Sequence, residues 1–196
     1  MNHAFKTKRG QRYFSNNGNS PMGFSFCGAL GAWFADPTRP IVCIIGDGGF
    51  NMNIQELQTL VNYGANVKTF ILDNRVYGIT KAFQETHFGQ RFEASGPKGY
   101  KPPNFYHICN AYGVENLALR EADDMERKIR YVLSRSHAVV CGVESLEFRT
   151  YEPKINGWAT PIEDMYPWLE REEFRTNMLI EPLPGWEKKE YGPYHG

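Results

Sequence analysis

No stretch of the 196-residue sequence approaches the roughly 20 consecutive apolar residues that a membrane-spanning helix requires. The basic residues near the N-terminus, Lys6, Lys8, Arg9 and Arg12, are not followed by the apolar segment of a signal peptide. The 22 basic residues are balanced by 22 acidic ones, which argues against a protein that holds polyphosphates by bulk charge. We therefore expect a cytoplasmic protein that binds neither membranes nor nucleic acids.

Cysteine and histidine are scarce and scattered. The sequence contains neither a C-x-x-C pair nor an H-E-x-x-H motif, which argues against a zinc site. The four cysteines lie far apart among apolar neighbours, at positions Cys27, Cys43, Cys109 and Cys141. We expect all four thiols to lie in the core, where a free cysteine behaves as a small apolar residue.

Composition changes along the chain. With 41% hydrophobic, 14% aromatic and 22% charged residues, the sequence as a whole is ordinary for a globular protein. The last 50 residues hold six of the 12 prolines and three of the four tryptophans, which makes them too aromatic for a solvated linker. We predict a regular domain over residues 1–146. A Pro/Trp-rich C-terminal extension then follows over residues 147–196 and packs on the domain or on a partner.

Short β-branched runs alternate with helical patterns through the first 146 residues. Buried strands are predicted at Ile41–Ile45, Val67–Leu72 and Ala138–Val143, with a shorter one at Asn116–Leu119. Helices are predicted at Met22–Ala35, from the Asn53/Glu56 capping box, after Pro102–Pro103, and from the Asp123/Glu126 capping box. This alternation indicates right-handed βαβ crossovers, and therefore an α/β fold: a three-layer αβα arrangement with a mostly parallel sheet.

The segment Gly46-Asp47-Gly48-Gly49 directly follows the first predicted strand, where ligands bind in sheets of this kind. Its glycines let the backbone approach a ligand, and the amide groups at the start of the next helix favour a phosphate. Asp47 would repel that phosphate unless a divalent cation lay between them. Taken alone, the motif is equally well explained as a tight turn in which Asp47 caps the helix.

The segment Asp73–Ile79 follows the second predicted strand, and 24 residues separate Gly48 from Asp73. Consecutive parallel strands joined by one helix usually lie side by side, so we expect Asp47 and Asn74 at the same edge of the sheet. Carboxylate, amide and backbone carbonyl oxygens are the ligands that Mg²⁺ prefers. By itself Asn74 would be an ordinary turn residue, but the two segments together predict a metal site.

The run GDGGFNMNIQEL, the 24-residue gap and the closing Asp-Asn resemble the cofactor-binding signature of thiamine diphosphate enzymes, in the acetolactate synthase-like branch. The resemblance extends to NGNSPMGFSFCGALGAWFA, YGITKAFQ and ATPIEDMYPWLEREEF, so it covers essentially residues 9–180. Two positions depart from the family pattern. Asp73 stands where asparagine is usual, and Cys27 stands where proline is common.

The resemblance implies thiamine diphosphate and Mg²⁺ as cofactors. It implies that the Asp47 and Asn74 side chains and the Val76 carbonyl hold the metal, and that Met22 bends the cofactor unless it is plain core. The cofactor-binding residues that it implies are Ser20, Met22, Gly46, Asp47, Gly48, Gly49, Asn74, Tyr77, Gly78 and Ile79. Ile79 and Phe83 would face the substrate, and the loop from Gln84 to Pro103 would form a mobile lid.

The resemblance also implies that no catalytic residue lies on this chain, because the activating glutamate of the family lies on a separate pyrimidine-binding domain. We expect the diphosphate-binding half of a transferase or lyase that acts on a 2-oxo acid, by acetolactate synthase-like carboligation or by decarboxylation. This half would be inactive alone and would work in a homo- or hetero-oligomer. The alternatives are a β-type subunit of a split 2-oxo acid decarboxylase, a non-catalytic assembly module, or a generic nucleotide-binding domain.

Overall fold

The computed structural model describes residues 5–16, 18–120, 122–146, 163–164 and 166–187. The chain divides into two compact units. One comprises residues 1–78 and 93–147, and the other comprises residues 79–92 and 148–196. Because residues 147–162 lie outside the described ranges, the C-terminal extension at 147–196 stays a prediction.

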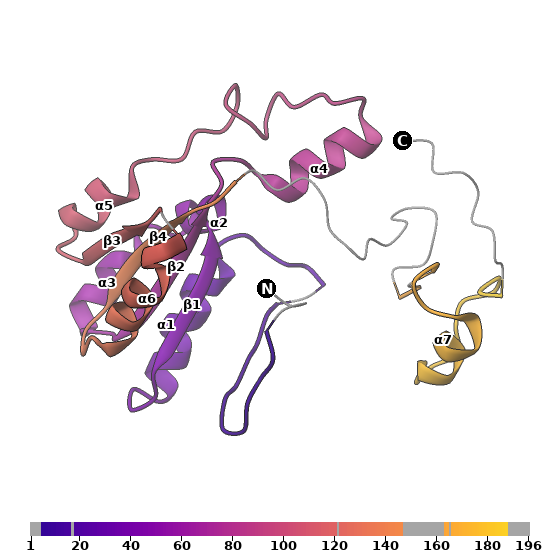
Figure 1. The fold of residues 1–196 in the computed structure, drawn as a ribbon, viewed down its shortest axis with the longest axis horizontal. Helices are drawn as coiled ribbons and strands as arrows, with labels where there is room; N and C mark the ends of the chain where they lie inside the picture. The colour runs from indigo at the N-terminus through magenta and orange to yellow at the C-terminus, as the bar shows by residue number, and fades with distance from the viewer. Residues whose placement is uncertain (1–4, 17, 121, 147–162, 165, 188–196) are drawn as a thin grey trace. The chain divides into compact units, whose positions relative to one another are not determined.

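The first unit is built on a four-stranded sheet in the order β1-β2-β4-β3, and every pairing in it is parallel (Figure 1). Its strands are β1 (Ile41–Gly46), β2 (Val67–Asp73), β3 (Glu115–Leu119) and β4 (Val139–Glu144). The strand predictions are therefore confirmed to within one residue at each end. The runs are rich in β-branched side chains, which fill both faces of a buried parallel sheet.

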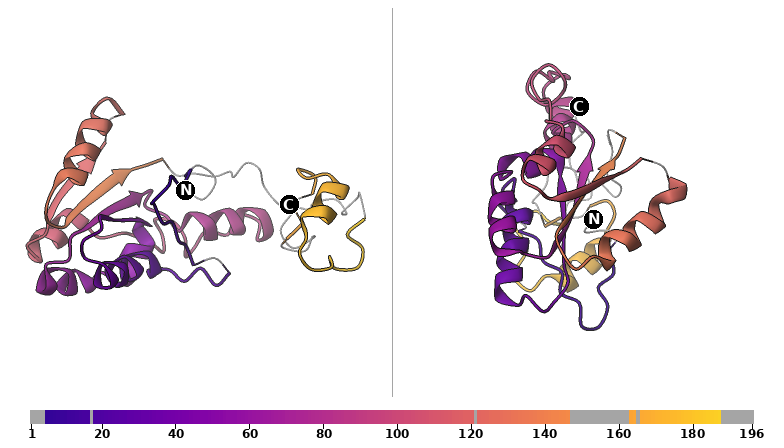
Figure 2. Two further views of the ribbon diagram at one scale, coloured as in Figure 1. Left: turned by 90° about the horizontal axis from the view of Figure 1, so that it is seen from below. Right: turned by 90° about the vertical axis from the view of Figure 1, so that its left-hand side faces the viewer.

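Helices cover both faces of this sheet, which confirms the three-layer αβα fold (Figure 2). The helices of the described residues are α1 (Phe24–Ala35), α2 (Asp47–Met52), α3 (Glu56–Tyr63), α4 (Gly78–His87), α5 (Phe105–Ala111), α6 (Met125–Ser134) and α7 (Arg171–Asn177). A short 3₁₀ turn, η1 (Ala122–Asp124), precedes α6.

The handedness of the crossovers decides which helix covers which face. The connections from β1 to β2 and from β2 to β3 run in one direction across the sheet, and their helices α3 and α5 pack on one face with α1. The connection from β3 back to β4 runs in the opposite direction. A right-handed crossover then places α6 on the opposite face, where Val132 packs with Phe70 and Cys141.

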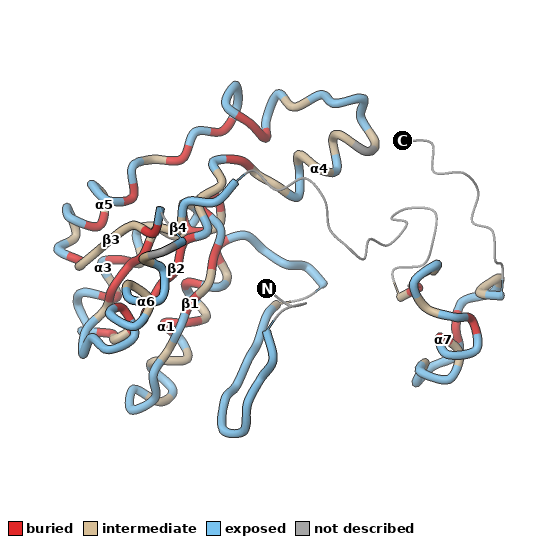
Figure 3. Tube along the Cα trace, viewed as in Figure 1, coloured by how far each residue is buried: buried red, intermediate tan, exposed pale blue. Residues whose placement is uncertain are grey.

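Helix α1 corrects one expectation about the cysteines. Cys43, Cys109 and Cys141 are buried as predicted, but Cys27 is exposed. The helix is apolar on most faces, yet only the face that carries Phe26 and its neighbours packs on the sheet (Figure 3).

The predicted start of the second helix is also wrong. Asn53 does not open a helix with a capping box; it closes α2, and α3 begins at Glu56 without a side-chain cap. The sequence hides α2 because consecutive glycines have low helix propensity. The prediction after Pro102–Pro103 is confirmed, since Asn104 accepts hydrogen bonds from the first N–H groups of α5. The side chain of Asp123, the other predicted cap, lies outside the described residues.

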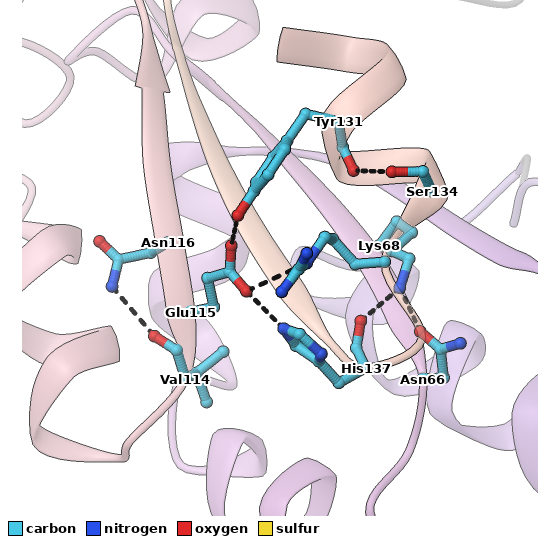
Figure 4. A network of polar contacts seen from close by, with 9 residues as sticks. Asn66, Lys68, Val114, Glu115, Asn116, Tyr131, Ser134 and His137 are labelled. Carbon is cyan, nitrogen blue, oxygen red and sulfur yellow. Dashed lines mark hydrogen bonds and ion pairs between the residues drawn. The ribbon is translucent and has the colours of Figure 1, made fainter.

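Polar side chains contact one another at the edge of the sheet where the strands begin (Figure 4). Glu115 accepts a hydrogen bond from the Tyr131 hydroxyl at 2.5 Å, contacts the His137 ring, and lies 3.6 Å from Arg135 Nε. Lys68, which is buried, donates to the Asn66 side chain and to the His137 carbonyl. We call Glu115, Tyr131, Arg135, His137, Lys68 and Asn66 the amino-edge network; in it, the Glu115 carboxylate is paired with basic side chains.

The second unit has a small core of its own around α7. The Arg171 guanidinium donates to both carboxylate oxygens of buried Asp164, at 2.7 and 2.9 Å, and to the Trp186 carbonyl. The rings of Tyr166 and Phe174 lie about 5 Å from the same guanidinium. Across the described ranges of both units, none of the helices is long and apolar enough to cross a bilayer.

Candidate functional site

The register of β1 and β2 places the two motif segments beside each other. Gly46 pairs with Leu72, so Asp47 and Asp73 follow directly at the same edge, on strands about 4.8 Å apart. Asp73 in turn pairs with Glu144 at the end of β4. The expectation that the segments after β1 and β2 meet at one edge is confirmed, and we call this edge the carboxyl edge.

Asp47 is the most deeply buried charged group of the carboxyl edge, with 2% of its surface exposed. It accepts hydrogen bonds from the backbone N–H groups of Gly48 and Arg75, and from the Tyr100 hydroxyl at 3.2 Å. The pKa of its carboxyl is raised to about 6, chiefly by burial and also by the nearby Asp73. In the described part of the chain these donors are neutral groups, so the charge of Asp47 is not compensated by a cation.

A turn after β2 supplies further oxygen atoms. The Asn74 side chain accepts a hydrogen bond from the Val76 N–H at 3.2 Å, and Arg75 adopts a left-handed backbone with φ 61°. One Asp73 oxygen is buried without a hydrogen-bond partner, and the other lies 3.8 Å from Arg75 Nη1. Two carboxylates and an amide form a donor set that fits Mg²⁺. Sequence reasoning treated Asp73 only as a departure from the family, although its position directly after β2 was a signal.

Two glycines of the motif, Gly48 and Gly49, have side chains packed against them. A Cβ atom on Gly48 would lie 2.4 Å from Tyr77 Cε1 and 3.0 Å from Met22 Cε. A Cβ on Gly49 would lie 3.1 Å from Ile45 Cγ1. The structure therefore brings Met22, Gly48 and Tyr77 together at the carboxyl edge, as their joint assignment to a binding site requires.

The structure also describes Ser20, Gly78, Ile79 and Phe83 of the predicted set. Ser20 is exposed, has a positive φ of 42°, and donates to the Asn16 carbonyl. Gly78 begins α4, where an added Cβ would lie 3.2 Å from the Asn74 amide nitrogen. Ile79 and Phe83 belong to the second unit and are 75% and 37% exposed, so their assignment to a substrate pocket stays a prediction.

Tyr100 is the residue of the carboxyl edge that sequence reasoning did not single out. Its ring stacks on Tyr77, with 4.0 Å between the ring centroids, and is 4% exposed. The Tyr77 N–H donates to the Ser95 carbonyl at 3.0 Å, which ties the turn after β2 to the segment before Tyr100. Because 53 residues separate Tyr100 from Asp47, no local pattern could have paired them.

A parallel αβα sheet with a glycine turn and a buried aspartate at its carboxyl edge defines a ligand-binding α/β domain. Comparison with known proteins identifies the kind of domain. The family described as the C-terminal TPP-binding domain of thiamine pyrophosphate enzymes matches residues 1–143, and the chain belongs to this family.

Curated relatives and a solved structure agree with this assignment. The chain is 36% identical over 130 residues to the probable acetolactate synthase large subunit of Methanocaldococcus jannaschii, which covers 66% of this chain and 22% of that protein. It is 34% identical over 124 residues to the acetolactate synthase large subunit of Cyanidium caldarium, covering 63% of this chain and 21% of the relative. The chain thus spans about a fifth of the length of these relatives.

The solved structure is that of the thiamine diphosphate-dependent 4-hydroxybenzoylformate decarboxylase of Rhodococcus jostii RHA1. It matches with a TM-score of 0.58 and 27% sequence identity, covering 66% of this chain and 24% of the decarboxylase. The sheet and its helices therefore have the fold of a thiamine diphosphate enzyme.

Proposed function

We propose that this chain is the diphosphate-binding half of a thiamine diphosphate- and Mg²⁺-dependent enzyme that acts on a 2-oxo acid, as a carboligase or a decarboxylase. The observation that carries the proposal is the buried, uncompensated Asp47 carboxylate beside Asp73 and Asn74, at the ends of two paired strands. A divalent cation would compensate these charges and join them to the diphosphate. Membership of the TPP-binding family supports the choice of ligand.

In this proposal Asp47, Asn74 and the Val76 carbonyl hold the metal. The backbone N–H group of Gly49, in the first turn of α2, donates to the diphosphate, while the Gly48 N–H stays on Asp47. Further contacts to the cofactor would come from Ser20, Met22, Gly46, Tyr77, Gly78 and Ile79. Met22, which lies against Gly48, would support the cofactor in a bent shape.

When bound, thiamine diphosphate supplies the electron sink for cleaving the bond next to the carbonyl of a 2-oxo acid. The chain's own residues bind and orient the charged end of the cofactor. Ile79 and Phe83 favour an apolar substrate group. We propose that a pyrimidine-binding domain or subunit completes the site in a cytoplasmic homo- or hetero-oligomer, and that the isolated chain binds the cofactor weakly and has no turnover.

The test is Asp47→Ala in the full 196-residue chain. Isothermal titration with thiamine diphosphate and Mg²⁺ should show binding by the original chain and a loss of affinity of about 100-fold or more in the variant, because the metal loses its only buried carboxylate ligand in the proposed set. EDTA should weaken binding by the original chain in the same way.

The matched control is Asp36→Ala, an aspartate before β1 that hydrogen-bonds Thr38 away from the carboxyl edge and should leave cofactor binding unchanged. Metal-dependent binding that survives Asp47→Ala would contradict the proposal. A non-catalytic assembly module would instead keep partner binding in Asp47→Ala and show no metal-dependent cofactor binding in either chain. Rapid decarboxylation of a 2-oxo acid by the purified chain alone would contradict the need for a second domain.

A further inference from the structure

The segment of residues 93–100, which we call the Tyr100 loop, is folded tightly on itself. The N–H groups of Gly99 and Tyr100 both donate to the Gly96 carbonyl, at 2.9 and 2.7 Å. A Cβ on Gly99 would lie 2.1 Å from the Glu93 carbonyl oxygen, so only glycine permits the packing. Ser95 is fully buried, and its carbonyl accepts the Tyr77 N–H. The loop therefore holds Tyr100 in a defined place rather than leaving it free.

That place is on top of the proposed metal and diphosphate site. The Tyr100 hydroxyl donates to Asp47 Oδ2 at 3.2 Å, and its ring stacks on Tyr77, which in turn lies against Gly48. Asp47 and Gly48 are both buried in this arrangement. The two tyrosine rings cover the carboxylate that would bind the cation and sit beside the turn that would bind the diphosphate.

The three donors to Asp47 differ in how they can respond to a cation. The N–H groups of Gly48 and Arg75 belong to the backbone of the edge itself and fix the carboxylate in place. The Tyr100 hydroxyl comes from a loop 53 residues away. Its proton occupies one of the lone pairs of Asp47 Oδ2, so a cation on the same oxygen would compete with the hydroxyl for this carboxylate.

We propose that Tyr100 is a gate on the proposed metal site: its hydroxyl and the cation compete for Asp47 Oδ2, and metal binding weakens this hydrogen bond. This inference rests on the proposed function. It makes the hydroxyl a competitor of the metal rather than a helper. Removing the hydroxyl alone must therefore strengthen metal binding.

The experiment compares the full chain with Tyr100→Phe, which removes the hydroxyl and keeps the stacked ring. The probe is Mn²⁺, titrated alone and with thiamine diphosphate, and free Mn²⁺ is measured by electron paramagnetic resonance. We expect the Kd for Mn²⁺ to fall about 3- to 10-fold in Tyr100→Phe, the size of one hydrogen bond that no longer competes. In the original chain Mn²⁺ should also change the near-ultraviolet absorption of tyrosine, and this change should shrink in the variant.

Tyr106→Phe is the matched control, because Tyr106 is exposed on α5, and it should leave the Mn²⁺ affinity unchanged. Circular dichroism will verify that all variants keep the fold. An unchanged or weaker Mn²⁺ affinity in Tyr100→Phe, with binding in the original chain still dependent on Asp47, overturns the gate and leaves the proposed function standing. The absence of any Asp47-dependent Mn²⁺ site in both chains overturns the proposed function and the gate together.

Discussion

Two carboxylates at opposite edges of the sheet, Glu115 and Asp47, lie in opposite electrostatic surroundings. At the amino edge, Glu115 is surrounded by Tyr131, His137 and Arg135, and its pKa is lowered, chiefly by the Tyr131 hydrogen bond. At the carboxyl edge, Asp47 is buried among neutral donors with Asp73 nearby, and its pKa is raised by burial. Both edges are made by the same parallel strands, so the difference comes from the loops and helix ends that meet there.

The two carboxylates therefore differ in what they contribute to stability and to ligand binding. A compensated carboxylate stabilises the folded state, whereas a buried and uncompensated one destabilises it until a ligand supplies the missing charge. The carboxyl edge also carries the glycines and the ring stack of the proposed binding site. Three substitutions test this difference between the two edges.

The largest effect is expected at Gly99. In Gly99→Ala the new Cβ would meet the Glu93 carbonyl and Ala94 Cα, at 2.1 and 2.6 Å, and backbone atoms cannot move aside cheaply. We expect a loss of about 3 kcal/mol in the free energy of unfolding, measured by urea denaturation, and faster proteolysis within the Tyr100 loop. Gly96→Ala is the control, since nothing lies within 4 Å of its added Cβ. Equal stability of the two variants would show that the loop does not depend on this packing.

A smaller effect of opposite sign is expected from Asp47→Asn. Between the ordinary pKa of 3.8 and about 6, the folded carboxyl holds a proton that the unfolded chain has released. Stability without metal must therefore fall as pH rises through this window. The asparagine does not titrate, so the variant should lack this fall in stability between pH 4 and 6 and should be about 2 kcal/mol more stable than the original chain at pH 7.

Urea unfolding at a series of pH values in EDTA would measure this difference. Added Mg²⁺ should stabilise the original chain but not Asp47→Asn, because metal binding favours the ionised carboxylate. The opposite result would be a rise in the stability of the original chain from pH 4 to 6 that Asp47→Asn removes. This result would contradict an uncompensated Asp47 carboxylate.

The smallest effect is expected at the amino edge. The lowered pKa of Glu115 means that its contribution is present above its ordinary value of 4.5 and is lost as pH falls through its folded value. Glu115→Gln should therefore lower stability at pH 7 by about 1 kcal/mol and make stability less dependent on pH below 4.5. The control is Glu126→Gln, whose ion pair with Arg130 is exposed and should matter by less than about 0.5 kcal/mol. Equal losses would mean that the amino-edge network adds nothing beyond a surface ion pair.

Local sequence patterns predicted the parts of the fold that depend on neighbouring residues. The apolar runs of β1 and β2 are bounded by Pro40, Gly46 and the polar turn after Leu72, so their limits were visible. The helix α2 was not visible, because its glycines mask it, and the exposure of Cys27 could not be known before the packing of α1 was known.

The alternation of strands and helices and the chemistry of the edge after β1 and β2 follow from the sequence, because both depend on short-range spacing. The contacts of Tyr100 with Asp47, and of Glu115 with His137 and Arg135, depend on the tertiary structure. Those contacts join residues far apart in the chain, and they form because strand order and crossover handedness bring loop ends together. Whether the charge of a carboxylate is compensated by a basic partner therefore depends on the fold rather than on its neighbours in the sequence.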